Sequence, residues 1–175
     1  MAVADSAHSR LVPHGLPLTV HTGPEAVQPQ TRKQKGDLAE LKVACDLRRR
    51  GYQVAIPFGE ESSYDLIVDR EGRLERLQVK YAERGARSVI EVRCYSMTIV
   101  NGKARSRTPY TRDTIDWLAV YDATTDQCFY IPAHELGDGR FSFTLRFAPA
   151  ANRQRVGVRF ADRYADLETD ERLNT

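Results

Sequence analysis

The chain has 175 residues with 26 Lys and Arg against 24 Asp and Glu, so its formal net charge is only +2. This balance excludes a protein that binds nucleic acid through a strongly basic overall composition, so any such role would depend on local clusters of charge. The length is that of one domain with a buried core.

Nothing in the sequence indicates a membrane or secreted protein. No apolar run reaches the length of a membrane span, and the N-terminal residues lack the apolar region of a signal peptide. Cys45, Cys94 and Cys128 lie far apart and lack the paired spacing of a metal site. We therefore expect buried thiols in a cytoplasmic, soluble protein with no membrane partner.

The first element expected in chain order is a helix. Residues 1–30 mix Pro, Gly, Ala and His without a period, which predicts a flexible leader. Residues 31–50 carry a broad apolar face, Thr31 and Gln34 fit a capping box, and Gly51 fits a helix stop. Glu40 is unusual because its neighbours three, four and seven residues on are Val43, Ala44 and Leu47, so its carboxylate lies along the apolar side.

A buried carboxylate needs a cation, a metal ion or hydrogen-bond donors, because burying it unpaired is costly. Gly36 lies one turn earlier on the same side and leaves space for such a partner. The ordinary alternative for Glu40 is a surface ion pair with Arg32, Lys33 or Lys35, which contributes little to stability.

The remaining elements are mainly strands. Apolar patterns predict them at residues 52–57, 88–97, 115–121, 127–132 and 141–147. Residues 101–112 are basic, contain Gly and Pro and lack a period, so we expect a loop there. A helical turn is expected at 133–136 and a short helix at 158–167, followed by a tail at 168–175. A helix leading into a mixed, mostly antiparallel sheet predicts an α/β (α+β) core.

The segment 64–81 is the most informative part of the chain. It alternates polar and apolar residues on both sides of a Gly-containing turn at 71–73, which predicts a β-hairpin. Asp65 then lies near the start of one strand, and Gln78 and Lys80 lie near the end of its antiparallel neighbour. Alternation places Gln78 and Lys80 on one face, and Leu77 and Val79 on the other.

The residue types that converge there have a common chemistry. The carboxylates of Glu40 and Asp65 and the amide oxygen of Gln78 are hard ligands, suited to Mg²⁺ or Mn²⁺ rather than zinc. Lys80 beside them could position a water or balance charge on a phosphate, and a metal would polarise the phosphoryl group. Taken singly, Asp65 could bond backbone amides at a strand start, and Gln78 and Lys80 could face solvent.

Asp65, then Gln78-Val79-Lys80, with Glu40 in a preceding helix, resembles the PD-(D/E)XK nuclease superfamily. Gln78, together with Gly36 four residues before Glu40, is similar to the intron-encoded homing endonuclease branch and more loosely to archaeal Holliday-junction resolvases. The stretches IDWLAVYDATTDQCFYIP and LRFAPAANRQRVGVRFADRY extend the likeness, so the nuclease domain is expected at residues 31–167. The resemblance implies a restriction-endonuclease-like core, a mixed sheet flanked by helices.

The resemblance also implies roles for individual residues. The catalytic positions would fall on Glu40, Asp65, Gln78 and Lys80, and the metal ligands on Glu40, Asp65 and Gln78, with Mg²⁺ as cofactor and Mn²⁺ as a substitute. Tyr64 stands where the family has Pro. Gln78 replaces the more common acid and removes a negative charge near the metal.

Three functions remain open on the sequence alone. The first is a metal-dependent DNA endonuclease that uses a Mg²⁺-activated water. The second is a catalytically weak or inactive DNA-binding module on the same fold, in which Gln78→Glu could confer activity. The third is a protein-interaction domain that uses an apolar sheet face and binds no DNA.

DNA contacts are expected from two basic clusters, because Arg and Lys bind phosphates and Asn and Gln can contact adenine edges. Their members are Lys103, Arg105, Arg107 and Arg112 in the first, and Arg146, Asn152, Gln154 and Arg159 in the second. A basic loop is otherwise simply solvated. A small nuclease that cuts both strands needs two sites, so by analogy we expect a homodimer or homotetramer.

Overall fold

The computed structural model describes residues 29–59, 61–85, 88–137, 139–149 and 157–167. The leader expected at 1–30 and the tail expected at 168–175 lie outside the described residues, apart from residues 29 and 30. None of the described helices has the length and apolar character needed to cross a bilayer.

The helix α1 (Arg32–Arg49) begins where the sequence predicts. The Thr31 hydroxyl accepts from the Gln34 backbone at 3.2 Å, and the Gln34 side-chain oxygen accepts from the Thr31 backbone at 2.8 Å. This capping box satisfies two of the amide groups that a helix start leaves without partners.

A five-stranded sheet forms the centre of the molecule in the order β1-β2-β3-β7-β8. Its strands are β1 (Gln53–Ala55), β2 (Leu66–Arg70), β3 (Arg73–Ala82), β7 (Trp117–Asp122) and β8 (Gln127–Pro132). The pairing of β3 with β7 is parallel and the other three pairings are antiparallel. The predicted hairpin is thus β2 and β3, with Leu66 opposite Leu77.

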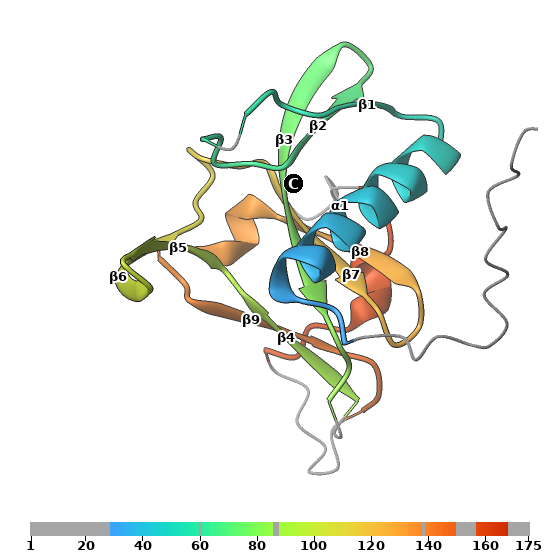
Figure 1. Ribbon diagram of the computed structural model, residues 1–175. Helices are drawn as coiled ribbons and strands as arrows, with labels where there is room; N and C mark the ends of the chain where they lie inside the picture. The colour runs from blue at the N-terminus through green and yellow to red at the C-terminus, as the bar shows by residue number, and fades with distance from the viewer. Residues whose placement is uncertain (1–28, 60, 86–87, 138, 150–156, 168–175) are drawn as a thin grey trace, which may run out of the picture.

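Both faces of this sheet are covered (Figure 1). On one face α1 packs through Ala39, Val43 and Leu47. On the other face lie β4 (Val89–Arg93), β9 (Ser142–Arg146), and the 3-10 turns η1 (Ala133–Leu136) and η2 (Ala161–Tyr164). All six residues of β7 are buried because this strand lies between the two layers.

Several sequence predictions need correction. Residues 101–112 are not a loop, since β6 (Lys103–Pro109) pairs antiparallel with β5 (Tyr95–Val100) in a separate hairpin. The single strand predicted at 88–97 is two strands that belong to different sheets, β4 and β5, and the break falls at Cys94. The helix predicted at 158–167 is only the four-residue turn η2.

The strand β6 was missed because most of its described side chains are exposed. Along β5 and β6, residues 96–98 and 105–108 are exposed, so no apolar residue needs to alternate with a polar one. The signal that could have identified it is Asn101-Gly102, whose φ values of 51° and 72° close a two-residue hairpin turn.

The cysteine prediction is also partly wrong. Cys94 is buried and Cys128 is partly buried, but Cys45 is exposed on α1. All three are free thiols.

Candidate functional site

Asp65 lies immediately before β2, at the point where β2 stops covering the edge of β3. Its backbone N–H donates to the Leu77 carbonyl at 2.8 Å. Its Oδ2 atom accepts from the Val79 backbone N–H at 2.7 Å and from the side-chain amide of Gln78. The carboxylate of Asp65 therefore continues the hydrogen bonding to β3 beyond the start of β2, and it is held against β3.

Gln78 and Lys80 lie two residues apart on the same face of β3, as alternation predicts. Gln78 is 8% exposed, whereas Leu77 and Val79 point to the other face and pack with α1. The Gln78 nitrogen is committed to Asp65, and no donor among the described residues bonds its side-chain oxygen. That oxygen remains as an acceptor next to the Asp65 carboxylate.

Lys80 is held by a residue that the sequence did not indicate. Its Nζ donates to the Tyr110 hydroxyl at 2.9 Å and lies 4.9 Å from the centre of the Tyr110 ring. Burial lowers the pKa of Lys80 below its usual 10.5, and the charges of Asp65, Cys94 and Glu40 oppose that shift. The lysine therefore lies in a poorly solvated place with carboxylates close enough to act on its charge.

Glu40 reaches this group from α1. It is partly buried, and among the described residues its carboxylate makes no hydrogen bond or ion pair, so the alternative of a surface ion pair with Arg32, Lys33 or Lys35 is not formed there. Burial raises the pKa of Glu40, the negative charges of Asp65 and Asp37 raise it further, and the positive charges of Lys33 and Lys80 oppose this shift. Gly36 has no atom within 4 Å of the position a Cβ would take, so this side of the helix is open.

The structure thus brings the four predicted residues together. Burial also raises the pKa of Asp65, against the opposing effects of the Val79 amide and Lys80. Two partly desolvated carboxylates that repel each other would be stabilised by a cation between them. Lys80 and, at Glu40, Lys33 supply part of the balancing positive charge, and a divalent cation held by the two carboxylates would supply more.

The donor set fits a hard divalent ion. The described residues contain no group of three or more His, Cys, Asp and Glu side chains arranged to hold a metal. Glu40 and Asp65 would therefore need the Gln78 amide oxygen, with water or phosphate oxygens, to complete the coordination. Magnesium accepts this arrangement because it commonly takes one or two carboxylates and keeps several waters.

Tyr110 and Cys94 are the site residues that sequence reasoning missed. The Tyr110 backbone N–H donates to the Cys94 carbonyl at 2.9 Å, and both side chains are buried. Burial raises the pKa of Tyr110, so its hydroxyl stays protonated near neutral pH. No local pattern identifies either residue, because Tyr110 reaches Lys80 across thirty positions of sequence.

The predicted DNA-contact residues lie in two places. Lys103, Arg105 and Arg107 are exposed on β6. Arg112 follows in the next turn, where it is exposed and its backbone oxygen accepts from Arg76 at 3.4 Å. Arg146 ends β9, and its backbone N–H donates to the Arg159 carbonyl at 2.9 Å, so these two are neighbours. Asn152 and Gln154 lie outside the described residues.

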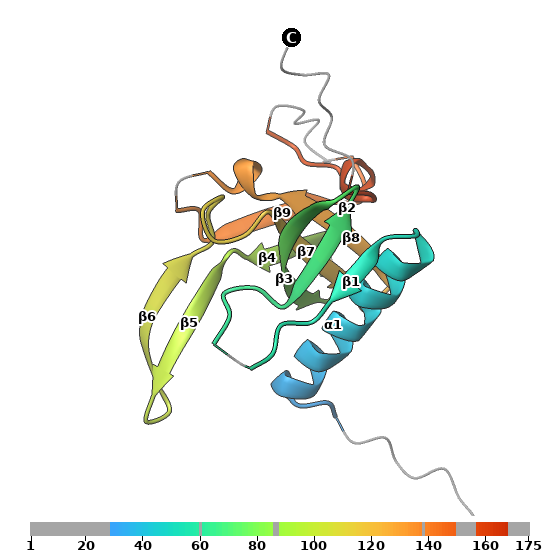
Figure 2. The same cartoon turned by 90° about the horizontal axis from the view of Figure 1, so that it is seen from above.

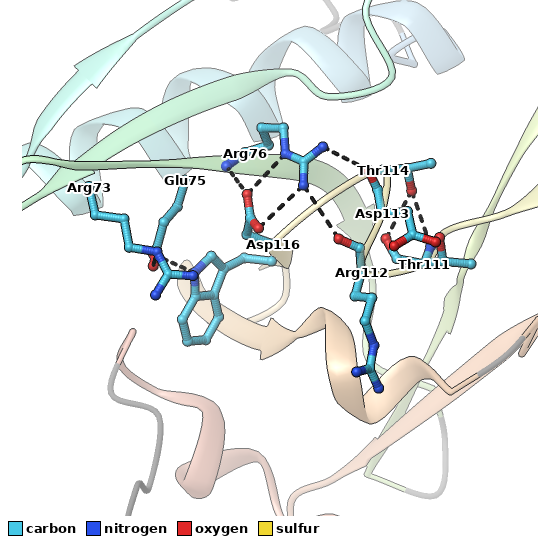
Figure 3. Close-up of polar contacts among 9 residues, drawn as sticks. Arg73, Glu75, Arg76, Thr111, Arg112, Asp113, Thr114 and Asp116 are labelled. Carbon is cyan, nitrogen blue, oxygen red and sulfur yellow. Dashed lines mark hydrogen bonds and ion pairs between the residues drawn. The ribbon is translucent and has the colours of Figure 1, made fainter.

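A cavity of about 650 Å³ lies elsewhere, at the turn end of β2 and β3. Its walls include Arg73, Glu75 and Asp116, and none of the four candidate catalytic residues lines it. In this wall, the Asp116 carboxylate accepts from the backbone N–H of Arg76 at 2.7 Å and from its guanidinium at 3.0 Å (Figure 3). Its polar groups pair with one another, as in Glu75, which bonds Trp117 at 2.7 Å and Arg70 at 3.2 Å. These contacts give the polar groups of the cavity structural partners, and the candidate site remains the group around Asp65.

Comparison with known proteins agrees with this geometry. A family model described as PD-(D/E)XK endonuclease matches residues 30–167. A solved structure of a bacterial homing endonuclease, I-Ssp6803I, is 25% identical, with a TM-score of 0.59 over 72% of this chain and 84% of that chain. No curated protein matches. Since the family model covers most of the chain and all four converging residues, the chain belongs to the PD-(D/E)XK endonuclease family.

Proposed function

We propose that the protein is a metal-dependent DNA endonuclease that hydrolyses phosphodiester bonds. The observation that supports it best is the convergence of Glu40, Asp65 and Lys80 from three separate segments. The charges of Asp65 and Lys80 act on the pKa of Glu40, and those of Asp65 and Glu40 act on the pKa of Lys80. The similar bacterial structure is that of a homing endonuclease, which favours DNA as the substrate here.

Each residue has a distinct part in this proposal. Asp65 and Glu40 would hold Mg²⁺, or Mn²⁺ in its place, and the Gln78 side-chain oxygen would be the third protein ligand. The bound ion would supply Lewis-acid polarisation of the phosphoryl group. Lys80, oriented by Tyr110, would donate to a phosphate oxygen or to the attacking water and balance negative charge as it develops. Val79 keeps the Asp65 carboxylate in one orientation through its backbone N–H.

The assembly belongs to the same proposal. The described residues of one chain offer one such site, so a double-strand break would require a second, and a homodimer or homotetramer would supply it. The cytoplasmic location expected from the sequence is part of this proposal as well.

The test is cleavage of supercoiled plasmid and branched DNA by the purified chain with Mg²⁺ or with a chelator. We expect Mg²⁺-dependent nicking, and at least about a hundredfold loss in Asp65→Ala and in Lys80→Ala, since positioned groups of this kind contribute about 10²–10⁴-fold. Asp69→Ala is a matched control, because Asp69 lies on the same strand and only caps the turn at Gly72. Equal nicking by wild type and the two site variants would contradict the mechanism.

A second function is favoured by one specific contact. The Gln78 side-chain nitrogen donates a hydrogen bond to Oδ2 of Asp65. An acidic residue at position 78 would instead add a negative charge beside this carboxylate. A weak or inactive DNA-binding module would have this character. It predicts salt-sensitive DNA binding without cleavage by the wild type, and Mg²⁺-dependent nicking gained by Gln78→Glu.

A further inference from the structure

The hairpin of β5 and β6, which we call the ribbon (residues 95–109), stands out from the body of the molecule (Figure 2). It forms its own two-stranded sheet, separate from the central one. Residues 96–98 and 105–108 are exposed, so neither face of the ribbon is buried against the core. An isolated two-stranded hairpin has marginal stability in water, so a projecting one of this kind is suited to packing against a partner.

The two faces of the ribbon differ in chemistry. In an antiparallel pair, residues directly opposite share a face. Ser96 lies opposite Thr108, and Thr98 lies opposite Ser106, so four small hydroxyl side chains share one face, on which the register also places Lys103 opposite Val100. The Ser96 hydroxyl donates to the Thr108 carbonyl at 3.5 Å. The other face carries Met97 opposite Arg107, whose guanidinium lies 5.3 Å from the centre of the Tyr95 ring.

The charge of the ribbon is of one sign. No Asp or Glu occurs between residues 94 and 112, whereas the whole chain is nearly balanced at +2. Lys103, Arg105 and Arg107 all lie in β6. Arg105 is the extra residue at which the register shifts, so it has no opposite partner on β5. This basic edge discourages pairing with the edge of another strand.

The base of the ribbon is fixed to the candidate active site. Cys94 and Tyr110 flank it, and the Tyr110 N–H donates to the Cys94 carbonyl at 2.9 Å. The Tyr110 hydroxyl in turn accepts from Lys80 at 2.9 Å. From this base the six residues of β5 reach roughly 20 Å, at about 3.3 Å per residue. Figure 2 shows the ribbon and α1 on opposite sides of β3.

We infer that the ribbon enters the major groove of duplex DNA and reads its sequence with the hydroxyl face of Ser96, Thr98, Ser106 and Thr108. The major groove is about 12 Å wide and admits a two-stranded ribbon, and Ser and Thr hydroxyls bond base edges as donor or acceptor. Lys103, Arg105 and Arg107 contact the flanking phosphates. Because base pairs rise about 3.4 Å each, the bases read lie within about six pairs of the scissile phosphate.

This inference rests on the proposed function only in taking duplex DNA as the substrate. Binding therefore tests it without cleavage. The full chain carrying Asp65→Asn is incubated with random-sequence duplexes in a chelator, bound sequences are selected, and affinities are measured over a range of salt.

The first comparison isolates charge. Arg105→Gln/Arg107→Gln is expected to weaken binding to every duplex and to lower the slope of log K against log salt by about two, since each phosphate contact contributes about 0.9. The control Arg49→Gln/Arg73→Gln removes the same charge at exposed positions off the ribbon and should leave that slope unchanged. Equal slopes for the two double variants would overturn the inference.

The second comparison isolates readout. Ser96→Ala, Thr98→Val, Ser106→Ala and Thr108→Val should each lower the preference for the selected sequence by roughly two- to tenfold, the value of one hydrogen bond. Binding to random duplex and the salt slope should not change. The control Ser142→Ala/Thr144→Val removes two exposed hydroxyls from β9 and should keep the preference.

The failures of the two proposals are distinguishable. If the hydroxyl variants keep the full sequence preference, or if the wild type has none, readout by the ribbon is wrong even where the wild type cleaves DNA. If preference depends on the ribbon but Mg²⁺ supports no nicking, the inference stands and the nuclease proposal fails. Because the changed side chains are exposed, folded variants are expected, and far-UV circular dichroism checks this.

Discussion

At the scale of single residues, Tyr110 links the chemistry to the rest of the molecule. Its hydroxyl fixes the position of the Lys80 ammonium, and its backbone closes the base of the ribbon against Cys94. Since Tyr110 is 4% exposed and neutral, it orients Lys80 without adding a charge. It is a positioning residue, whereas Lys80 is the group expected to touch the substrate.

Tyr110→Phe should lower the rate of DNA cleavage by about two- to tenfold, because Lys80 loses the hydroxyl acceptor that orients it. The matched control is Tyr130→Phe, which removes a buried hydroxyl that donates to Asp46 at 2.6 Å. Both variants lose one hydrogen bond and are expected to melt at similar temperatures. Equal cleavage rates for the two would contradict the positioning role.

At the scale of elements, α1 has two functions on one surface. Ala39, Val43 and Leu47 are fully buried against the sheet, and Glu40 lies beside Ala39 on the flank of that apolar face. The packing of Leu47 and Val43 therefore sets where the Glu40 carboxylate stands relative to Asp65. A helix that packed loosely would misplace one of the two carboxylates.

Leu47→Ala should lower the free energy of unfolding by about 2–5 kcal/mol, because it removes a fully buried side chain and leaves a cavity. Urea unfolding at neutral pH measures it. Leu41→Ala on the same helix is the control, since Leu41 is 65% exposed and its loss should change stability by less than about 0.5 kcal/mol. Similar losses in both variants would show that α1 does not pack as described.

At the scale of the whole molecule, the parallel pairing of β3 with β7 joins the two halves of the sheet. Asp116 lies at this junction, because its carboxylate bonds the backbone and side chain of Arg76 and its carbonyl accepts from Ala133 at 2.9 Å. Partial burial would raise the pKa of Asp116, but the hydrogen bonds and charge of Arg76 outweigh it and hold the pKa below the usual 3.8.

A carboxyl whose pKa is lowered by folding stabilises the protein above its unfolded pKa and loses this effect as the pH falls through the folded value. Asp116→Asn should therefore cost about 1–2 kcal/mol at neutral pH, and the difference from wild type should shrink below about pH 4. Urea unfolding between pH 7 and pH 2, with Asp113→Asn as an exposed neighbour for control, checks this. A difference that stays constant down to pH 2 would contradict it.

Much of the fold could be predicted where the local pattern was strong. The capping residues Thr31 and Gln34, the hairpin of β2 and β3, and the α+β class are confirmed, as is the convergence of Asp65 with Gln78. Their catalytic roles and the metal stay predictions. The ribbon was missed because it is solvated on both faces, which removes the apolar alternation by which strands are identified.

By itself the sequence determined the elements whose apolar period or end residues are written locally, together with the residue types that a phosphodiester hydrolase needs. Only the tertiary structure decided that Tyr110 holds Lys80, that Glu40 makes no ion pair among the described residues, and that a basic segment stands out as a ribbon at the site. The reason is physical: periodicity and capping depend on neighbours a few residues apart, whereas these contacts join segments brought together by the packing of α1, the sheet and the β4–β9 layer.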